Sequence, residues 1–161
     1  MSIKAAARIT IFLLLLGTSS KAQMASFEQS TLVIDTGAGA RSFTIELAVN
    51  ERQKEQGLMF RRTMAADAGM LFDLGETQQA AFWMKNTLIP LDMLFITEAG
   101  CIADIHERAV PLSEASIFSK VPVRAVLELN GGTVARLGIK SGDRVRHPWF
   151  DRGSASVCAP G

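Results

Sequence analysis

Three consecutive polar residues, Lys85-Asn86-Thr87, interrupt an apolar stretch near the middle of the chain. They follow Trp83 and precede Pro90, a setting typical of a turn at the end of a strand. In a binding loop, the lysine would meet an anion, the amide and hydroxyl would orient it, and the indole would supply an apolar wall. In a capped turn, the same Asn and Thr would bond only to nearby backbone groups, which is their more common use.

Two carboxylates, Asp92 and Glu128, stand inside apolar segments. A carboxylate buried in such a segment needs a partner or stays protonated. If both faced one pocket, they could act as an acid/base pair or bind a hard metal ion. Alternatively, one of them could pair with Lys85 or Arg61 and brace the loop. Strand alternation offers a third interpretation, in which the apolar neighbours face the core and the carboxylates face water.

Arg61 and Arg62 are adjacent, and together with Lys85 they favour an anionic group on a ligand. Short basic clusters of this kind are also common on solvated surfaces. The sequence therefore predicts a ligand-binding surface in which the two carboxylates act as supports. Its members are Arg61, Arg62, Trp83, Lys85, Asn86, Thr87, Asp92 and Glu128.

Metal and cofactor sites are not predicted. His106 follows Asp104 at the same-face spacing of a strand, but the two histidines of the chain show no repeated ligand spacing. The methionines near aromatic residues lack a Met-x-x-Met array, which favours core packing over copper binding. The sequence has no phosphate-binding glycine loop, no HExxH, no CxxC and no nucleophile elbow.

The first 22 residues have the pattern of a secretory signal peptide. Lys4 and Arg8 precede an apolar run at 9–16, and small residues surround a cleavage position after Ala22. The run is shorter than the ~20 residues needed to span a bilayer, so no transmembrane segment is expected after cleavage. The sequence thus predicts export to the periplasm or the extracellular space.

Charge and cysteine content refine this expectation. Residues 1–22 hold three of the 17 basic residues and none of the 16 acidic ones, leaving 14 basic against 16 acidic residues. A nearly neutral chain gives no electrostatic reason to expect nucleic acid as a partner. Export would permit a disulfide between Cys101 and Cys158, but the sequence alone leaves their pairing open.

Short strands dominate the expected secondary structure. Strands are predicted at 32–35, 41–49, 69–74, 80–84, 91–97, 101–107, 123–129 and 144–147. The pairs 32–35/41–49 and 91–97/101–107 form hairpins. A helix is predicted at 51–56, with Asn50 and Gln53 in a capping box and Gly57 ending it, and a helical turn at 133–137.

This pattern predicts a mainly β fold (β-rich α+β), a small barrel or sandwich with two short helices. Residues 110–120 are expected to form a loop. The domain boundaries are a signal peptide at 1–22, a polar leader at 23–30, a single β-rich domain at 31–150 and a flexible tail at 151–161.

Three sequence blocks carry a resemblance to a known family. They are Gly57-Leu58-Met59-Phe60-Arg61-Arg62 with Gly69-Met70-Leu71-Phe72, Phe82-Trp83-Met84-Lys85-Asn86-Thr87 with 90–96, and Val126-Leu127-Glu128-Leu129-Asn130-Gly131-Gly132 with 138–140 and 142–145. From about Thr31 to about Val145, the chain resembles the secreted family called domain of unknown function 192. The resemblance implies a small, single, largely β domain that often follows a signal peptide. The family has no settled activity, so the resemblance implies no catalytic residue.

These observations favour a non-catalytic ligand-binding or accessory module of the cell envelope, although the sequence leaves catalysis open. The expected partner is an unidentified small molecule or an envelope protein. One alternative is a hydrolase- or lyase-type enzyme that uses Asp92 and Glu128. Another is a structural protein-interaction module, which would present an apolar patch instead of a polar pocket.

Overall fold

The computed structural model describes residues 24–150 and Cys158. The predicted signal peptide and all of the predicted tail except Cys158 lie outside the described residues. In chain order, the elements are β1 (Glu28–Thr36), β2 (Gly39–Ala48), α1 (Glu51–Gln56), β3 (Ala68–Gln78), β4 (Ala81–Phe82), β5 (Leu91–Ile96), β6 (Ile102–Ala109), β7 (Ile117–Phe118), β8 (Val123–Asn130), α2 (Thr133–Leu137) and β9 (Arg144–Arg146). The prediction of a β-rich domain with two short helices is confirmed.

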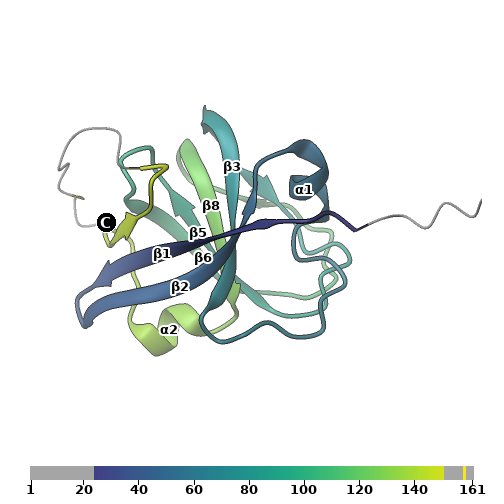
Figure 1. The fold of residues 1–161 in the computed structure, drawn as a ribbon, viewed down its shortest axis with the longest axis horizontal. Coiled ribbons are helices and arrows are strands. Elements are labelled where there is room, and N and C mark those ends of the chain that lie inside the picture. The colour runs from purple at the N-terminus through teal and green to yellow at the C-terminus, as the bar shows by residue number, and fades with distance from the viewer. Residues whose placement is uncertain (1–23, 151–157, 159–161) are drawn as a thin grey trace, which may run out of the picture.

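Seven strands form one curled, half-barrel sheet in the order β6-β5-β8-β3-β2-β1-β9 (Figure 1). Strands β2 and β3 pair in parallel, whereas the other neighbours are antiparallel. The curl brings the two edge strands together at one point, where Cys101 bridges Arg144. There the Val145 amide donates to the Gly100 carbonyl at 2.7 Å, and the Ile102 amide donates to the Asp143 carbonyl at 3.0 Å.

Both predicted hairpins are present. In the first, β1 and β2 pair from Glu28↔Leu47 to Thr36↔Gly39, and alternate side chains such as Leu32 and Ile45 are buried. In the second, β5 pairs with β6. Strand β1 begins at Glu28, so the last three residues of the predicted polar leader belong to it. Those residues pair through their backbones, which needs no apolar side chain and leaves little sequence pattern.

Helix α1 forms and ends as predicted. The Asn50 side chain accepts from the Gln53 amide at 3.0 Å, and the Gln53 side chain accepts from the Asn50 amide at 3.2 Å, which completes the capping box. Gly57 ends the helix with φ of 45°, a backbone conformation that side chains disfavour. A Cβ at Gly57 would also lie 3.2 Å from the Phe72 ring, so this glycine lets the helix end contact β3 closely.

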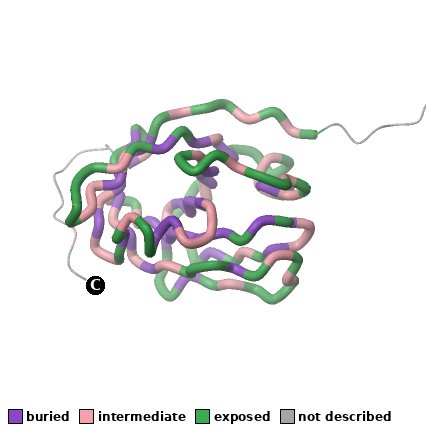
Figure 2. The backbone as a smooth tube through the Cα atoms, turned by 90° about the horizontal axis from the view of Figure 1, so that it is seen from below, coloured by how far each residue is buried: buried purple, intermediate pink, exposed green. Residues whose placement is uncertain are grey.

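The sheet has two hydrophobic cores, one on each face. The concave face gathers side chains from all seven strands together with Val134 of α2, including Ile34, Ile45, Leu71, Leu94, Leu127 and Val145. The other face gathers Met70, Phe72, Met93, Phe95 and Val126 beneath Leu58, Met84 and Ile89 from the segments that cover it. Val134 of α2 belongs to the concave-face core, whereas α1 leads into Leu58 of the other core, and the two helices lie well apart (Figure 1). Along the backbone, buried positions are interspersed with intermediate and exposed ones (Figure 2).

The covering segments differ most from the predicted elements. The strand predicted at 80–84 shortens to β4, and the loop predicted at 110–120 contains β7, which pairs with β4. Ser119 joins the two segments, because its hydroxyl accepts from the Ala80 amide at 2.9 Å and its amide donates to the Ala80 carbonyl at 3.0 Å. Within residues 24–150 and Cys158, no helix is long and apolar enough to cross a membrane.

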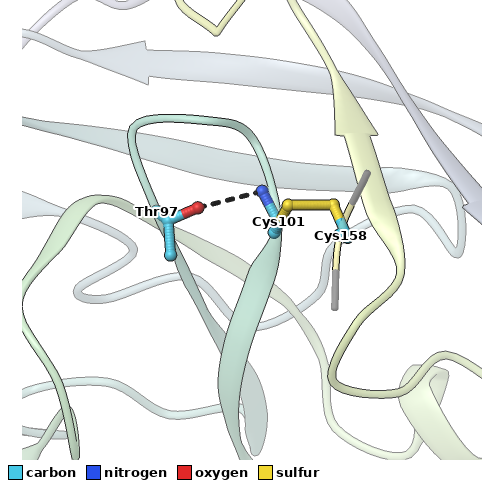
Figure 3. The surroundings of a disulfide bond; sticks show 3 residues. All are labelled: Thr97, Cys101 and Cys158. Atoms are coloured by element: carbon cyan, nitrogen blue, oxygen red, sulfur yellow. Dashed lines mark hydrogen bonds between the residues drawn. A yellow bond between two sulfur atoms is a disulfide. The ribbon is translucent and has the colours of Figure 1, made fainter. Parts of the chain in front are cut away.

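Cys101 and Cys158 form a disulfide, which settles the pairing that the sequence left open. Their Cα atoms lie 5.5 Å apart, and 57 positions separate them in the chain. The Cys101 amide also donates to the Thr97 hydroxyl at 3.2 Å, which holds the connection between β5 and β6 (Figure 3). The bond therefore attaches Cys158 to the place where the sheet edges meet.

Removing this disulfide should destabilise the domain, because an unfolded chain closed by a 57-residue separation has less conformational entropy than an open one. For the double variant Cys101→Ser/Cys158→Ser, we expect a loss of up to about 4 kcal/mol in the free energy of unfolding. Urea unfolding followed by circular dichroism measures it. A reductant should lower the midpoint of the wild type and leave that of the variant unchanged. Equal midpoints for the two oxidised proteins would contradict the prediction.

Candidate functional site

A cavity of about 380 Å³ lies on the convex face of the sheet, between the end of α1, strand β3 and the segment around β4. Its walls are mainly apolar, formed by Leu58, Met59, Phe72, Leu74, Phe82 and Trp83. The last turn of α1 contributes Lys54, Glu55 and Gln56 to the lining. The remaining lining residues are Gly57, Ala81, Thr87 and Glu128. This size and composition suit a small organic molecule.

Glu128 places a carboxyl group in this cavity. It lies on β8 opposite Met70 of β3 and Met93 of β5, and its side chain is only 4% exposed. Among residues 24–150 and Cys158, no group donates a hydrogen bond to this carboxyl or forms an ion pair with it. Its oxygens border the cavity and are not sealed inside the protein. Burial alone raises the pKa of Glu128 from its ordinary 4.5 to about 8, so the carboxyl is protonated at neutral pH.

Three aromatic rings, of Phe72, Phe82 and Trp83, belong to the cavity lining. Phe72 and Phe82 meet edge to face, with ring centroids 5.0 Å apart. Trp83 stands at the rim with 48% of its surface exposed. The Lys85 ammonium lies 5.0 Å from the centre of the Trp83 ring, and it also lies 3.9 Å from Glu114. The rim therefore already holds one cation against an aromatic face.

The Lys85-Asn86-Thr87 turn is where three loops meet. The Phe60 amide donates to the Asn86 carbonyl at 2.9 Å, and the Leu112 amide donates to the Thr87 carbonyl at 3.0 Å. Phe60, Asn86 and Leu112 have positive φ angles of 65°, 55° and 62°. Such angles are costly for residues other than glycine and gather at functional sites. The turn thus holds the rim of the cavity in one conformation.

The comparisons with known proteins identify the family. Residues 32–147 match the family DUF192, described as an uncharacterised conserved region. This chain belongs to the DUF192 family. The match confirms the resemblance drawn from the three sequence blocks, two of which contain the cavity residues Trp83 and Glu128.

Two solved structures are similar to this DUF192 chain. One, from Sinorhizobium meliloti 1021, is described as a candidate transcription regulator and is 55% identical in sequence. The matched region spans 76% of this chain and 95% of the Sinorhizobium chain, with a TM-score of 0.74. The other, a protein of unknown function from Novosphingobium aromaticivorans DSM 12444, is 36% identical in sequence. The matched region spans 81% of this chain and 99% of the Novosphingobium chain, with a TM-score of 0.73. A search of curated proteins found no match.

Of the eight site residues predicted from the DUF192 sequence, Trp83, Thr87 and Glu128 line the cavity. Lys85 stands next to it, over Trp83. Asn86 does not line it, and its side-chain amide instead approaches the Met59 sulfur at 3.8 Å. Thr87 is 5% exposed, and its hydroxyl donates to the Lys85 carbonyl at 3.3 Å. The capped-turn and binding-loop interpretations therefore both describe part of this segment.

The two arginines lie away from the cavity lining. Arg61 binds Glu46 through both guanidinium nitrogens at 2.7 and 2.6 Å, and this hydrogen bonding raises the pKa of Arg61. Glu46 is in register with Met70, which is in register with Glu128, so the Arg61 pair sits two strands away from the cavity carboxyl. Arg61 therefore does not brace Glu128 or Asp92, as one interpretation had it. Arg62 is exposed.

Asp92 is fully buried on the concave face of the sheet and has a different role from Glu128. Its carboxylate accepts three backbone hydrogen bonds, from Arg108 at 2.8 Å, Gly132 at 3.0 Å and Val134 at 2.8 Å. The last two anchor the start of α2, so Asp92 acts as a cap from another strand. Asp92 is not exposed to solvent, as strand alternation predicted it would be, and it does not share a pocket with Glu128. The strand register explains why the two carboxylates are separated. Glu128 lies opposite Met93, and successive side chains of a strand point to opposite faces, so Asp92 faces away from Glu128.

Sequence reasoning missed the contribution of α1 and of the ring pair Phe72 and Phe82. The composition of 51–56 is polar, which is typical of a surface helix, but tertiary packing makes its last turn a wall of the cavity. The Gly57 block of the DUF192 pattern is the one sequence signal that could have pointed to it. Elsewhere, His106 is exposed and Asp104 pairs with Lys120 at 2.7 Å. The described residues contain no cluster of three or more groups suited to a metal ion.

The Glu128 carboxyl should make the stability of the domain fall as pH rises. Between its ordinary pKa of 4.5 and its folded value of about 8, the unfolded chain has released the proton that the folded protein keeps. The free energy of unfolding then falls by up to about 1.4 kcal/mol per pH unit. Below this window the contribution is complete, and above it the contribution is lost.

Glu128→Gln isolates this effect, because the amide keeps the shape of the protonated carboxyl and does not titrate. Urea unfolding at pH 5, 6, 7 and 8 should give a wild-type curve that falls relative to that of the variant. The variant should be the more stable protein at pH 8. Parallel curves across this range would show that Glu128 does not hold its proton in the folded protein.

Proposed function

We propose that this DUF192 chain is an exported cell-envelope domain that binds a small molecule, without catalysis, in the cavity above Glu128. The observation that carries the proposal is that the Glu128 carboxyl, on a side chain only 4% exposed, borders the cavity and has no partner among the described residues. A polar group in such a place costs folding free energy, which an apolar residue of similar size would avoid. A ligand that forms a hydrogen bond or ion pair with the carboxyl would offset this cost in free energy. The apolar walls supply the rest of a binding site.

The enzymatic alternative finds little support. A hydrolase or lyase based on Asp92 and Glu128 needs both carboxyls at one substrate. The carboxylate of Asp92 is saturated by backbone amides on the other face of the sheet. Glu128 alone could exchange a proton with a ligand, but nothing else in the cavity lining supplies a nucleophile activated by a neighbouring base. Binding is therefore the better supported function.

A role in transcription, suggested by the description of the Sinorhizobium meliloti relative, is the second candidate. Recognition of DNA usually places a helix in the major groove and neutralises phosphates with free basic residues. In the described part of the chain, α1 has six residues and α2 has five. Arg61, Arg124 and Arg146 there pair with carboxylates. These features do not support direct DNA binding.

Ligand binding can be tested by nuclear magnetic resonance with the folded domain and a library of small neutral, cationic and anionic fragments. We expect some fragments to shift the amide signals of Gly57, Phe82 and Thr87. Trp83→Ala should weaken these fragments at least tenfold, because it removes one wall of the cavity. Val121→Ala is the matched control, an exposed apolar residue outside the lining, and should leave their affinity unchanged. A library without cavity binders, or binders indifferent to Trp83→Ala, would reject the proposal.

Export is supported by the signal-like residues 1–22 and by the Cys101–Cys158 disulfide, since structural disulfides persist in oxidising compartments. The full chain expressed in a Gram-negative host should be recovered from the periplasm. Its intact mass should match residues 23–161 less about 2 Da for the oxidised cysteine pair. Recovery of the full-length reduced chain from the cytoplasm would reject the exported location.

A further inference from the structure

We propose that the cavity selects a protonated amine, with the ammonium group at the Glu128 carboxyl and an apolar body against Phe72, Phe82 and Leu58. This inference rests on the proposed ligand-binding function and names its ligand class. It excludes anions from the base of the cavity, and so it differs from the anionic ligand that the basic residues suggested. Three observations on the cavity support it.

The first observation is that both polar side chains at the base of the cavity can accept hydrogen bonds from a ligand. The Glu128 carboxyl has no donor among the described residues and borders the cavity. The Thr87 hydroxyl uses its hydrogen on the Lys85 carbonyl at 3.3 Å, which leaves its oxygen free to accept another. An ammonium group carries three donors and no acceptor, and it therefore complements this arrangement.

The second observation is the aromatic lining. Phe72, Phe82 and Trp83 all border the cavity, and aromatic faces attract cations, most strongly where water is excluded. The Lys85 ammonium, 5.0 Å from the Trp83 ring centre, shows that the rim accommodates such a contact. A carboxyl combined with aromatic walls suits an amine better than it suits an alcohol or a carboxylate.

The third observation is the charge of the groups around the carboxyl. From α1, Lys54 and Glu55 line the cavity, and the Lys54 ammonium is 2.8 Å from the Glu51 carboxylate. From β3 and β5, Met70 and Met93 flank Glu128 and do not titrate. At the rim, Lys85 lies between Trp83 and Glu114. None of these cations reaches Glu128, so the charge of an ammonium ligand would have no competitor at the carboxyl.

Binding of an ammonium group is coupled to release of a proton. The free protein holds Glu128 protonated at neutral pH, because burial raises its pKa to about 8. When R–NH₃⁺ enters, the carboxyl ionises, its proton goes to solvent, and a carboxylate–ammonium pair remains. Affinity should therefore rise by up to about tenfold per pH unit below pH 8 and become constant above it, while the amine itself stays protonated.

Isothermal titration calorimetry with 2-phenylethylamine and its uncharged analogue 2-phenylethanol tests this inference. At pH 8, we expect the amine to bind at least tenfold more tightly than the alcohol. Between pH 6 and pH 7, its affinity should rise several-fold. Titrations at pH 6.5 in two buffers of different ionisation enthalpy should show release of nearly one proton per amine bound.

Variants assign the effect to the carboxyl. Glu128→Gln should abolish the preference for the amine, the pH dependence and the proton release, while the alcohol still binds. Glu76→Gln, which removes an exposed carboxylate of β3 outside the cavity lining, is the matched control and should retain all three. The unfolding curves of Glu128→Gln described above establish that this variant is folded.

The outcomes separate the two proposals. Equal affinity for the amine and the alcohol, pH-independent amine binding, or an amine preference that survives Glu128→Gln overturns the amine inference and leaves the ligand-binding function standing. Failure of both probes to bind also overturns the inference. The function itself fails only if the fragment library yields no binder that responds to Trp83→Ala.

Discussion

Strands β5 and β8 are buried on both of their faces, and each face requires its own cover. The curl of the sheet covers the concave face, which therefore needs the edge strands β6 and β9 to come together. The convex face has no second sheet of comparable size, so α1, the β4–β7 pair and long loops cover it. Loops pack less completely than strands, and the cavity lies where this cover meets Glu128 of β8. The position of the site thus follows from how the two central strands are buried.

The two carboxylates on these central strands show that the segments packed over each face determine the environment of a buried acid. Asp92 and Glu128 occupy similar apolar sequences, yet Asp92 receives three backbone N–H groups and Glu128 receives none. Three donors compensate for the loss of water around Asp92, and two of them organise the start of α2. Around Glu128, burial acts alone and favours the neutral acid. Equivalent residues in the sequence therefore become a structural cap and a reactive group in a pocket.

Local features were predictable from the sequence, and non-local ones were not. Hairpins, the Asn50 capping box and the Gly57 helix end depend on residues within a few positions of one another, and all of these formed as expected. The parallel pairing of β2 with β3 and the cavity itself join distant segments. Alternation failed for Asp92, because this rule assumes one wet face and β5 has none. Glu128, Trp83 and Thr87 were predicted as site residues because their types are unusual in their setting, whereas Phe72 and Leu58 look like ordinary core.

The closure of the sheet between Gly100–Cys101 and Arg144–Val145 also bears on which walls of the cavity can change shape. A curl fixed by backbone ladders leaves the strands little freedom to widen the cavity. On the covering side, the loops that contain Asn86 and Thr87 are joined to one another by a few backbone hydrogen bonds. Substitutions in those loops could enlarge or narrow the cavity without disturbing the position of the carboxyl. The size of the cavity and the acid group beside it are therefore set by separate parts of the fold.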